Sequence, residues 1–241
     1  MKNRHLQWAY LLPFSCYGVF FVVHLQPDFV FSRRLNQCIM NNIQNQEQTK
    51  TENNTEIKKW KILGTRYIIK RPWLTARCDT VQLPNGVIND EYYILEYPTW
   101  VNVIAITTDG KFVMARQYRH GLQDVFTELV AGVAEKGETP LEAAKRELAE
   151  EAGYGNGEWK LFSALSQNPA STNNITYTFL ATGVERISSQ SLDRTEDLAI
   201  KFLSEDEVLQ LLLREDLKQS LMVAPLWKYF ALKSNAQKLP D

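Results

Sequence analysis

The 241-residue sequence is poor in cysteine, has no excess charge of either sign and shows no internal repeat. Its three cysteines are far apart and form no CxxC pair, which argues against a disulfide framework and against a zinc site. The 27 lysine and arginine residues balance 28 aspartate and glutamate residues, so the basic surface typical of nucleic-acid-binding proteins is missing. With 44% hydrophobic residues, the chain can form a sizeable core. We therefore expect a globular, cytoplasmic protein that binds no nucleic acid.

The first 57 residues form an extension whose composition differs from the rest. Residues 8–25 are an apolar run interrupted by Pro13, whereas residues 41–57 are polar and typical of a solvated tail. The apolar run has three open interpretations: a signal peptide, a membrane anchor, or a stretch upstream of a natural start at Met40. The misplaced start is favoured, and we expect membrane contact only if the run is a real anchor.

Residues 58–98 predict a small antiparallel β segment. Three stretches rich in aromatic and β-branched residues follow one another here, and the turn sequence Pro-Asn-Gly at 84–86 separates the last two.

Residues 99–235 predict one mixed α/β domain. Strand-type segments surround a central helix, at residues 101–107, 111–119, 125–132, 163–169, 175–184 and 198–204. Two further helices are expected to close the chain, at residues 204–215 and 219–234. The fold class is therefore α/β with a mixed sheet, preceded by the small antiparallel segment.

The central helix is predicted to begin at Pro140. Thr139 supplies a hydroxyl N-cap, proline suits the first helical position, and Glu142 completes a capping box. Gly153 supplies a C-terminal stop. Apolar residues at spacings of three and four form a stripe that should face the core: Leu141, Ala144, Leu148 and Ala152.

Glu147, Glu150 and Glu151 occupy positions i, i+3 and i+4 of this helix, so their carboxylates share one side. Three like charges so close together repel, and they lie near the helix end that disfavours anions. Taken alone, this pattern favours a solvated acidic face. A divalent cation is the functional alternative, because Mg²⁺ prefers carboxylate oxygens.

The residues around the glutamates change that balance. Residues 132–154 read GVAEKGETPLEAAKRELAEEAGY, which resembles the Nudix signature G-x5-E-x7-R-E-U-x-E-E-x-G-U at every fixed position. The last position, Tyr154, is aromatic where an aliphatic residue is usual. The resemblance implies a Nudix α/β/α sandwich and a hydrolase that cleaves the diphosphate of a nucleoside-diphosphate-linked small molecule.

The resemblance also implies roles for individual residues. Glu147, Glu150 and Glu151 would hold Mg²⁺, with Mn²⁺ as the alternative ion, and the backbone carbonyl of Ala131 would serve a further ion. Arg146 would pair with Glu138 to brace the loop and the helix. Gly132 and Gly153 would have structural roles in the backbone.

The flanking residues resemble the ADP-ribose and nucleotide-sugar pyrophosphatase branch of that family. Gln117-Tyr118-Arg119 matches a strand motif of the branch, and residues 128–132 match its E-[LF]-P-A-G motif except at Val130. The N-terminal β segment is another feature of the branch, where it drives homodimer formation. Arg119 would grip a phosphate.

Two more residues of the N-terminal β segment are candidate substrate contacts. Arg77 would bind a phosphate, as its forked guanidinium allows, although a role in the surface of a strand is favoured for it. Trp73, or Trp60 in its place, would stack on a base, although aromatic residues at such positions more often belong to a sheet core.

One departure from this branch leaves the general base open. Many ADP-ribose pyrophosphatases have a catalytic glutamate at the end of a loop that here reads NPASTNN, at residues 168–174, without a carboxylate. Glu150 or Glu151 could accept the proton instead. A cluster beyond the next strand, Asp193, Glu196 and Asp197, is a second source, although an ordinary polar turn is favoured there.

Two alternative functions follow from the same resemblance. The protein could hydrolyse another nucleotide, such as a nucleoside triphosphate, coenzyme A or a dinucleoside polyphosphate. It could also bind ADP-ribose without cleaving it, as Nudix-like sensor domains do. The intact set of glutamates and the short tail after Lys218 count against a sensor.

Overall fold

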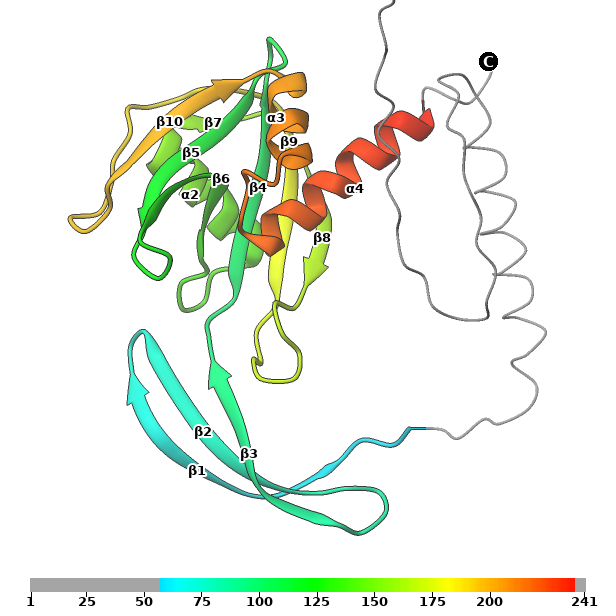
Figure 1. Cartoon of the computed structure of the whole chain (residues 1–241). Helices are drawn as coiled ribbons and strands as arrows, with labels where there is room; N and C mark the ends of the chain where they lie inside the picture. Colours follow the sequence, from blue (N-terminus) through cyan, green and yellow to red (C-terminus); the bar gives the residue numbers. More distant parts are fainter. Residues whose placement is uncertain (1–56, 237–241) are drawn as a thin grey trace, which may run out of the picture. The chain divides into compact units, whose positions relative to one another are not determined.

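The described part of the chain, residues 57–236 of a computed structural model, begins with a three-stranded antiparallel sheet (Figure 1). Its strands pair in chain order and are β1 (Lys61–Arg71), β2 (Leu74–Gln82) and β3 (Ile88–Glu96). Gly86 has a φ of 87° in the connection between β2 and β3, a backbone conformation that favours glycine. The predicted antiparallel segment is confirmed.

The predictions for residues 8–25 and for Met40 lie outside the described residues. Between residues 57 and 236, no helix is both long and apolar enough to cross a membrane.

A larger mixed sheet follows. Its strands are β4 (Trp100–Thr107), β5 (Phe112–Arg119), β6 (Asp124–Val133), β7 (Tyr154–Gly155), β8 (Glu158–Leu165), β9 (Thr176–Arg186) and β10 (Leu198–Leu203). They lie in the order β10-β5-β6-β4-β9-β7, and β8 pairs with β9. Only β4 and β9 run parallel, and every other pair is antiparallel. Strand β6 pairs with β4 at one end and with β5 at the other, so the sheet curls.

Helices cover both faces of this sheet (Figure 1). Helix α2 (Pro140–Ala152) packs on one face, and α3 (Glu205–Leu213) and α4 (Ser220–Ala236) pack on the other. Alternate strand residues point to opposite faces, which explains why Val103 joins the core under α2 while its neighbour Ile104 joins the core under α3 and α4. The predicted α/β/α arrangement with a mixed sheet is confirmed.

The apolar stripe of α2 also faces the core as predicted. Ala144 and Leu148 are completely buried, and Leu141 and Ala152 pack beside them. One strand boundary was wrong: the segment expected at 163–169 is the end of β8, which begins at Glu158 and stops at Leu165. The strand stops there because Leu165 pairs with Thr176, the first residue of its partner strand β9. In the turn that follows, the Ser171 and Thr172 N–H groups donate to the backbone oxygen of Asn168.

Candidate active site

Helix α2 begins and ends as its sequence predicts. The Thr139 hydroxyl accepts from the Glu142 N–H, and the Glu142 carboxylate accepts from the Thr139 N–H at 2.8 Å, which completes the capping box. Gly153 ends the helix in the left-handed conformation, with φ 73°. A Cβ at Gly153 would lie 2.5 Å from the backbone oxygen of Ser188, so only glycine fits. Both ends of the acidic helix are therefore fixed.

Arg146 is the centre of the acidic cluster. Its Nε and Nη2 donate to the Glu138 carboxylate at 2.9 and 3.1 Å, and Nη1 donates to Glu147 and Glu150, both at 2.9 Å. Nη2 also donates to the backbone oxygen of Val133 at 2.9 Å. The hydrogen bonds to Glu138, foremost, raise the guanidinium pKa above its usual value. Arg146 thus joins the loop before α2 to the helix, and the predicted pair with Glu138 is present.

Glu147 lies directly over Gly132. A Cβ at Gly132 would lie 2.1 Å from the Glu147 carboxyl carbon, so this position must lack a side chain for the carboxylate to reach its place. Burial raises the pKa of Glu147, and Arg146 opposes that rise. Gly132, the first glycine of the signature, therefore makes room for Glu147.

Glu151 is the most deeply buried of the three helix glutamates, with 4% of its surface exposed. Burial, helped by the charge of Glu147, raises its pKa to about 8. Its Oε2 atom has no hydrogen-bond partner within the described residues, a costly state for a buried carboxylate oxygen. Glu150, in contrast, keeps 45% of its side chain exposed.

The raised pKa of Glu151 predicts how the stability of the metal-free protein depends on pH. An unfolded glutamate ionises near 4.5, whereas Glu151 in the folded protein keeps its proton until about pH 8. Between these values the folded state binds the extra proton, so the free energy of unfolding falls as pH rises. Each unit of pKa shift corresponds to about 1.4 kcal/mol, and we expect a loss of about 2 to 4 kcal/mol. Urea unfolding in chelator at pH 5 and pH 8 measures it.

Glu151→Gln is the matched variant for that experiment, because it keeps the size of the side chain and cannot ionise. Its unfolding free energy should change much less across the same pH range. An equal pH dependence in the variant and in the wild type would contradict the assignment to Glu151.

The loop between β9 and β10 is attached to the C-terminal end of α2. The Ser191 N–H of this loop donates to the backbone oxygen of Glu150 at 2.8 Å. The side-chain amide of Gln190 donates to the backbone oxygen of Glu151, also at 2.8 Å. The last carbonyl groups of a helix have no partner within the helix, and the last turn of α2 has no basic side chain that could donate to them. The bonds from the loop therefore satisfy the carbonyls of Glu150 and Glu151. The same loop carries Glu196, whose negative charge contributes to the raised pKa of Glu151. One member of the predicted acidic cluster thus lies within electrostatic reach of the helix glutamates.

Within the described chain, no three acidic, histidine or cysteine side chains already converge on a single ion-binding point. In this structure the Nη1 atom of Arg146 holds one oxygen of Glu147 and one of Glu150. The donor types nevertheless suit a hard cation, because they are carboxylates and one buried oxygen of Glu151 is without a partner.

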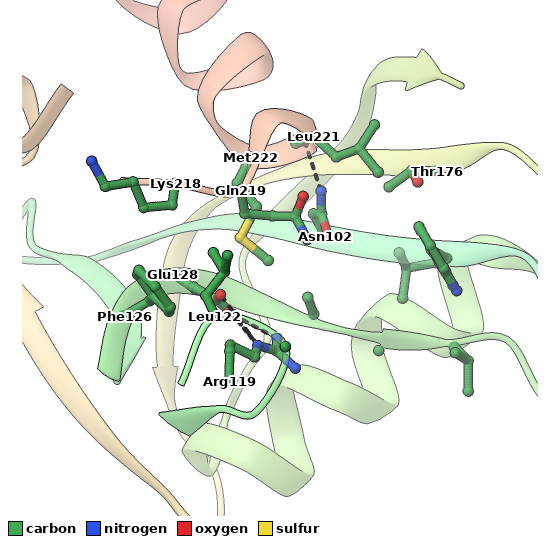
Figure 2. A pocket seen from close by; sticks show the side chains of 16 residues that line it. Asn102, Arg119, Leu122, Phe126, Glu128, Thr176, Lys218, Gln219, Leu221 and Met222 are labelled. Carbon is green, nitrogen blue, oxygen red and sulfur yellow. Dashed lines mark hydrogen bonds and ion pairs between the residues drawn. The ribbon is translucent and has the colours of Figure 1, made fainter. Parts of the chain in front are cut away.

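A cavity of about 430 Å³ reaches the same part of the sheet (Figure 2). Ala131 and Gly132 of β6 line it, next to Arg119. Arg119 donates from Nε and Nη2 to the Glu128 carboxylate at 3.0 and 2.6 Å, while Glu128 itself is buried. The predicted phosphate-binding arginine is therefore held at the cavity by a buried carboxylate.

Two predicted substrate contacts are not brought to this cavity within one chain. Arg77 lies in the N-terminal sheet, where it pairs with Asp79 at 3.1 Å and also with Glu96. Trp73 lies where β1 turns into β2 and is 78% exposed. Trp60 stacks edge-on against Tyr92 of the same sheet.

The loop without a carboxylate has a structural role. The side-chain amide of Asn174, at its last position, donates to the backbone oxygen of Pro98 at 3.1 Å. Earlier in the loop, the backbone oxygen of Ser171 accepts from the Leu95 N–H at 2.8 Å. The backbone oxygen of Ala170 accepts from the Tyr92 hydroxyl, also at 2.8 Å. These bonds join the loop to β3 and to the segment that follows it.

Sequence reasoning missed the cavity residues contributed by other parts of the fold. Asn102 comes from the buried strand β4, Thr176 from the start of β9, and Leu221 and Met222 from the first turn of α4. The sulfur of Met222 accepts a hydrogen bond from the Leu129 N–H at 3.3 Å. Leu129 lies at the point where the pairing of β6 changes from β5 to β4. These residues form no local motif, so no signal in the sequence identifies them.

Comparison with known proteins gives consistent results. Residues 97–223 match the NUDIX domain family model, and residues 60–95 match the nucleoside diphosphate sugar hydrolase N-terminal domain. The chain is 34% identical over 151 residues to the methanol dehydrogenase activator of Bacillus methanolicus, covering 62% of this chain and 81% of that one. It is 33% identical over 134 residues to the ADP-ribose pyrophosphatase of Bacillus subtilis, covering 55% and 72%.

A further relative and a solved structure agree with these matches. The ADP-ribose pyrophosphatase of Mycobacterium tuberculosis is 28% identical over 151 residues, covering 61% of this chain and 72% of that one. A crystal structure of an ADP compounds hydrolase superposes with a TM-score of 0.67 at 22% identity, covering 77% of this chain and all of the other, which indicates a shared fold.

Proposed function

The chain belongs to the Nudix hydrolase family, in its ADP-ribose pyrophosphatase and nucleoside diphosphate sugar hydrolase branch, and we propose that it hydrolyses the diphosphate of ADP-ribose or of a nucleoside-diphosphate sugar. The products are a nucleoside monophosphate and a sugar phosphate. The observation that carries this proposal is the direct succession of the two family matches, residues 60–95 and then 97–223. A Nudix hydrolase of other nucleotides would need only the NUDIX domain at residues 97–223.

Glu147, Glu150, Glu151 and the backbone carbonyl of Ala131 are the proposed ligands of Mg²⁺. The buried, unpartnered oxygen of Glu151 supports this assignment, because a cation would supply the interaction that the protein does not. An ion held by these residues would neutralise diphosphate charge and lower the pKa of the attacking water. Arg146 positions two of these carboxylates and is itself a positioning residue.

The chain's own residues bind the substrate and accept the proton. Arg119 faces the cavity with two guanidinium nitrogens bound to Glu128, and its Nη1 is the nitrogen proposed to bind a phosphate oxygen. The proposed proton acceptor for the attacking water is Glu150 or Glu151 of α2, and Glu196 is the second candidate. Glu196 lies in the loop that is attached to the end of α2, where its carboxylate accepts from the Asp193 N–H at 2.9 Å.

The N-terminal sheet is proposed to form a homodimer. Residues 58–98 would be the dimer module and residues 99–235 the catalytic domain. Large apolar side chains on the sheet are exposed to a degree unusual for a monomer, among them Ile62 at 59% and Ile68 at 52%. Arg77 and Trp73 would then contribute to the site of the partner subunit. Sedimentation should give twice the chain mass, and a monomer at micromolar concentration would contradict the proposal.

The substrate class is tested by comparing ADP-ribose, a nucleoside-diphosphate hexose and nucleoside triphosphates at equal concentration with Mg²⁺. The proposal predicts release of nucleoside monophosphate from the first two at rates well above triphosphate hydrolysis. Preference for triphosphates would overturn the assignment within the family. Tight binding of ADP-ribose without any turnover across the panel would indicate a sensor.

A further inference from the structure

The proposed function leaves one part of the cavity without a role. In Figure 2, Asn102, Leu221 and Thr176 lie on the opposite side of the cavity from Arg119 and Glu128. Asn102 is 3% exposed and its side-chain amide donates to the backbone oxygen of Leu221 at 2.9 Å. Thr176 is 2% exposed, and its hydroxyl has no hydrogen-bond partner within the described chain.

An unpartnered buried hydroxyl is costly for the folded protein. Such a group has lost its hydrogen bonds to water and gained none in the protein. Valine has nearly the shape of threonine, favours strands equally well and would avoid the cost at this position. Thr176 begins β9 and pairs in register with Trp100 of β4, so its backbone gives no reason for a hydroxyl. Thr176 is one of the residues that line the cavity, so a ligand bound there is a candidate for the missing hydrogen-bond partner.

The chemistry of the two sides of the cavity indicates which part of a ligand each side accepts. Arg119 is cationic and suits phosphate oxygens, whereas Asn102 and Thr176 are neutral. A hydroxyl that can both donate and accept matches a group with the same capacity, such as the hydroxyl of a sugar. The nearby apolar side chains of Leu221 and Met222 can contact the carbon face of a sugar ring.

We propose that Thr176 and Asn102 form a subsite for the hydroxyl groups of the sugar in the sugar-phosphate half of the substrate, with Thr176 as a specificity-determining residue. This inference rests on the proposed function. The hydroxyl of Thr176 donates to or accepts from a sugar hydroxyl, while the Asn102 amide, fixed by its bond to α4, offers its oxygen.

The test uses the two product halves as separate probes, ribose 5-phosphate and AMP, each as an inhibitor of ADP-ribose hydrolysis. Thr176→Val removes the hydroxyl and keeps the shape, and Thr176→Ser keeps the hydroxyl. The valine variant should weaken inhibition by ribose 5-phosphate about tenfold, the effect of losing one hydrogen bond, while inhibition by AMP stays within about twofold. The serine variant should restore most of the ribose 5-phosphate affinity.

Two results would overturn the proposal: weaker inhibition by AMP instead, which would place the nucleoside at this side, or unchanged inhibition by both products. Thr176→Ala gives the same expected pattern and serves if the valine variant does not fold. Calorimetric titration of each protein with ribose 5-phosphate requires no turnover. A wild type that binds ribose 5-phosphate but hydrolyses no ADP-ribose would refute the proposed function and still test the subsite.

Discussion

Glu151→Gln is expected to reduce Mg²⁺-dependent hydrolysis of ADP-ribose by about 10² to 10³-fold or more while leaving the fold intact. The change removes the carboxylate that Mg²⁺ would hold in its ionised form. This carboxylate belongs to the most buried glutamate of α2, and its Oε2 has no hydrogen-bond partner among residues 57–236. Because glutamine has nearly the same shape, packing around α2 should be preserved. Steady-state kinetics and urea unfolding, measured on the same preparations, check both parts of the prediction.

Glu158→Gln is the matched control, since Glu158 is exposed at the start of β8. It should hydrolyse ADP-ribose at the wild-type rate. If Glu151→Gln also retained the wild-type rate, Glu151 would not be a metal ligand and the proposed site would be wrong.

Arg146→Gln is expected to lower the free energy of unfolding of the metal-free protein by about 2 to 3 kcal/mol. Arg146 is the cation that Glu138, Glu147 and Glu150 share, and its removal leaves their negative charges facing one another. It also leaves the backbone oxygen of Val133 without this donor. Urea unfolding in chelator measures the change.

Mg²⁺ gives this prediction a second readout. If the carboxylates bind the ion, Mg²⁺ should restore more of the lost stability in Arg146→Gln than it adds to the wild type, because the ion replaces the missing positive charge. Arg116→Gln, a change at an exposed arginine of β5, should cost little. Equal destabilisation in the two variants would show that the acidic cluster does not depend on Arg146.

Local chemistry made the helix predictable. The capping box, the apolar stripe and the left-handed glycine each depend on residues within a few positions of one another, and the structure shows all three. The charge pair between Arg146 and Glu138 was predicted from the resemblance to the Nudix signature, and the structure contains it.

Burial of the glutamates was not predictable from spacing. Positions i, i+3 and i+4 share a helix side, yet Glu151 is buried while Glu150 is half exposed. The difference arises from β6, which lies under Glu147 at Gly132, and from the loop after β9, which binds the end of the helix. Contacts between segments so far apart leave no periodic pattern in the sequence.

The cavity could not be predicted from the sequence for the same reason. Asn102, Thr176 and Met222 come from three elements that meet only in the folded chain. The resemblance to the pyrophosphatase branch identified Arg119, which belongs to the motif Gln117-Tyr118-Arg119, whereas no motif includes Thr176.

We propose above that this chain hydrolyses a nucleoside-diphosphate sugar with a metal ion held by α2. The most direct measurement is the release of AMP from ADP-ribose by the purified protein in millimolar Mg²⁺ and in chelator. We expect equal amounts of AMP and ribose 5-phosphate with Mg²⁺ and no detectable product in chelator. Product formation at the same rate in chelator, or no AMP release with Mg²⁺, would contradict it.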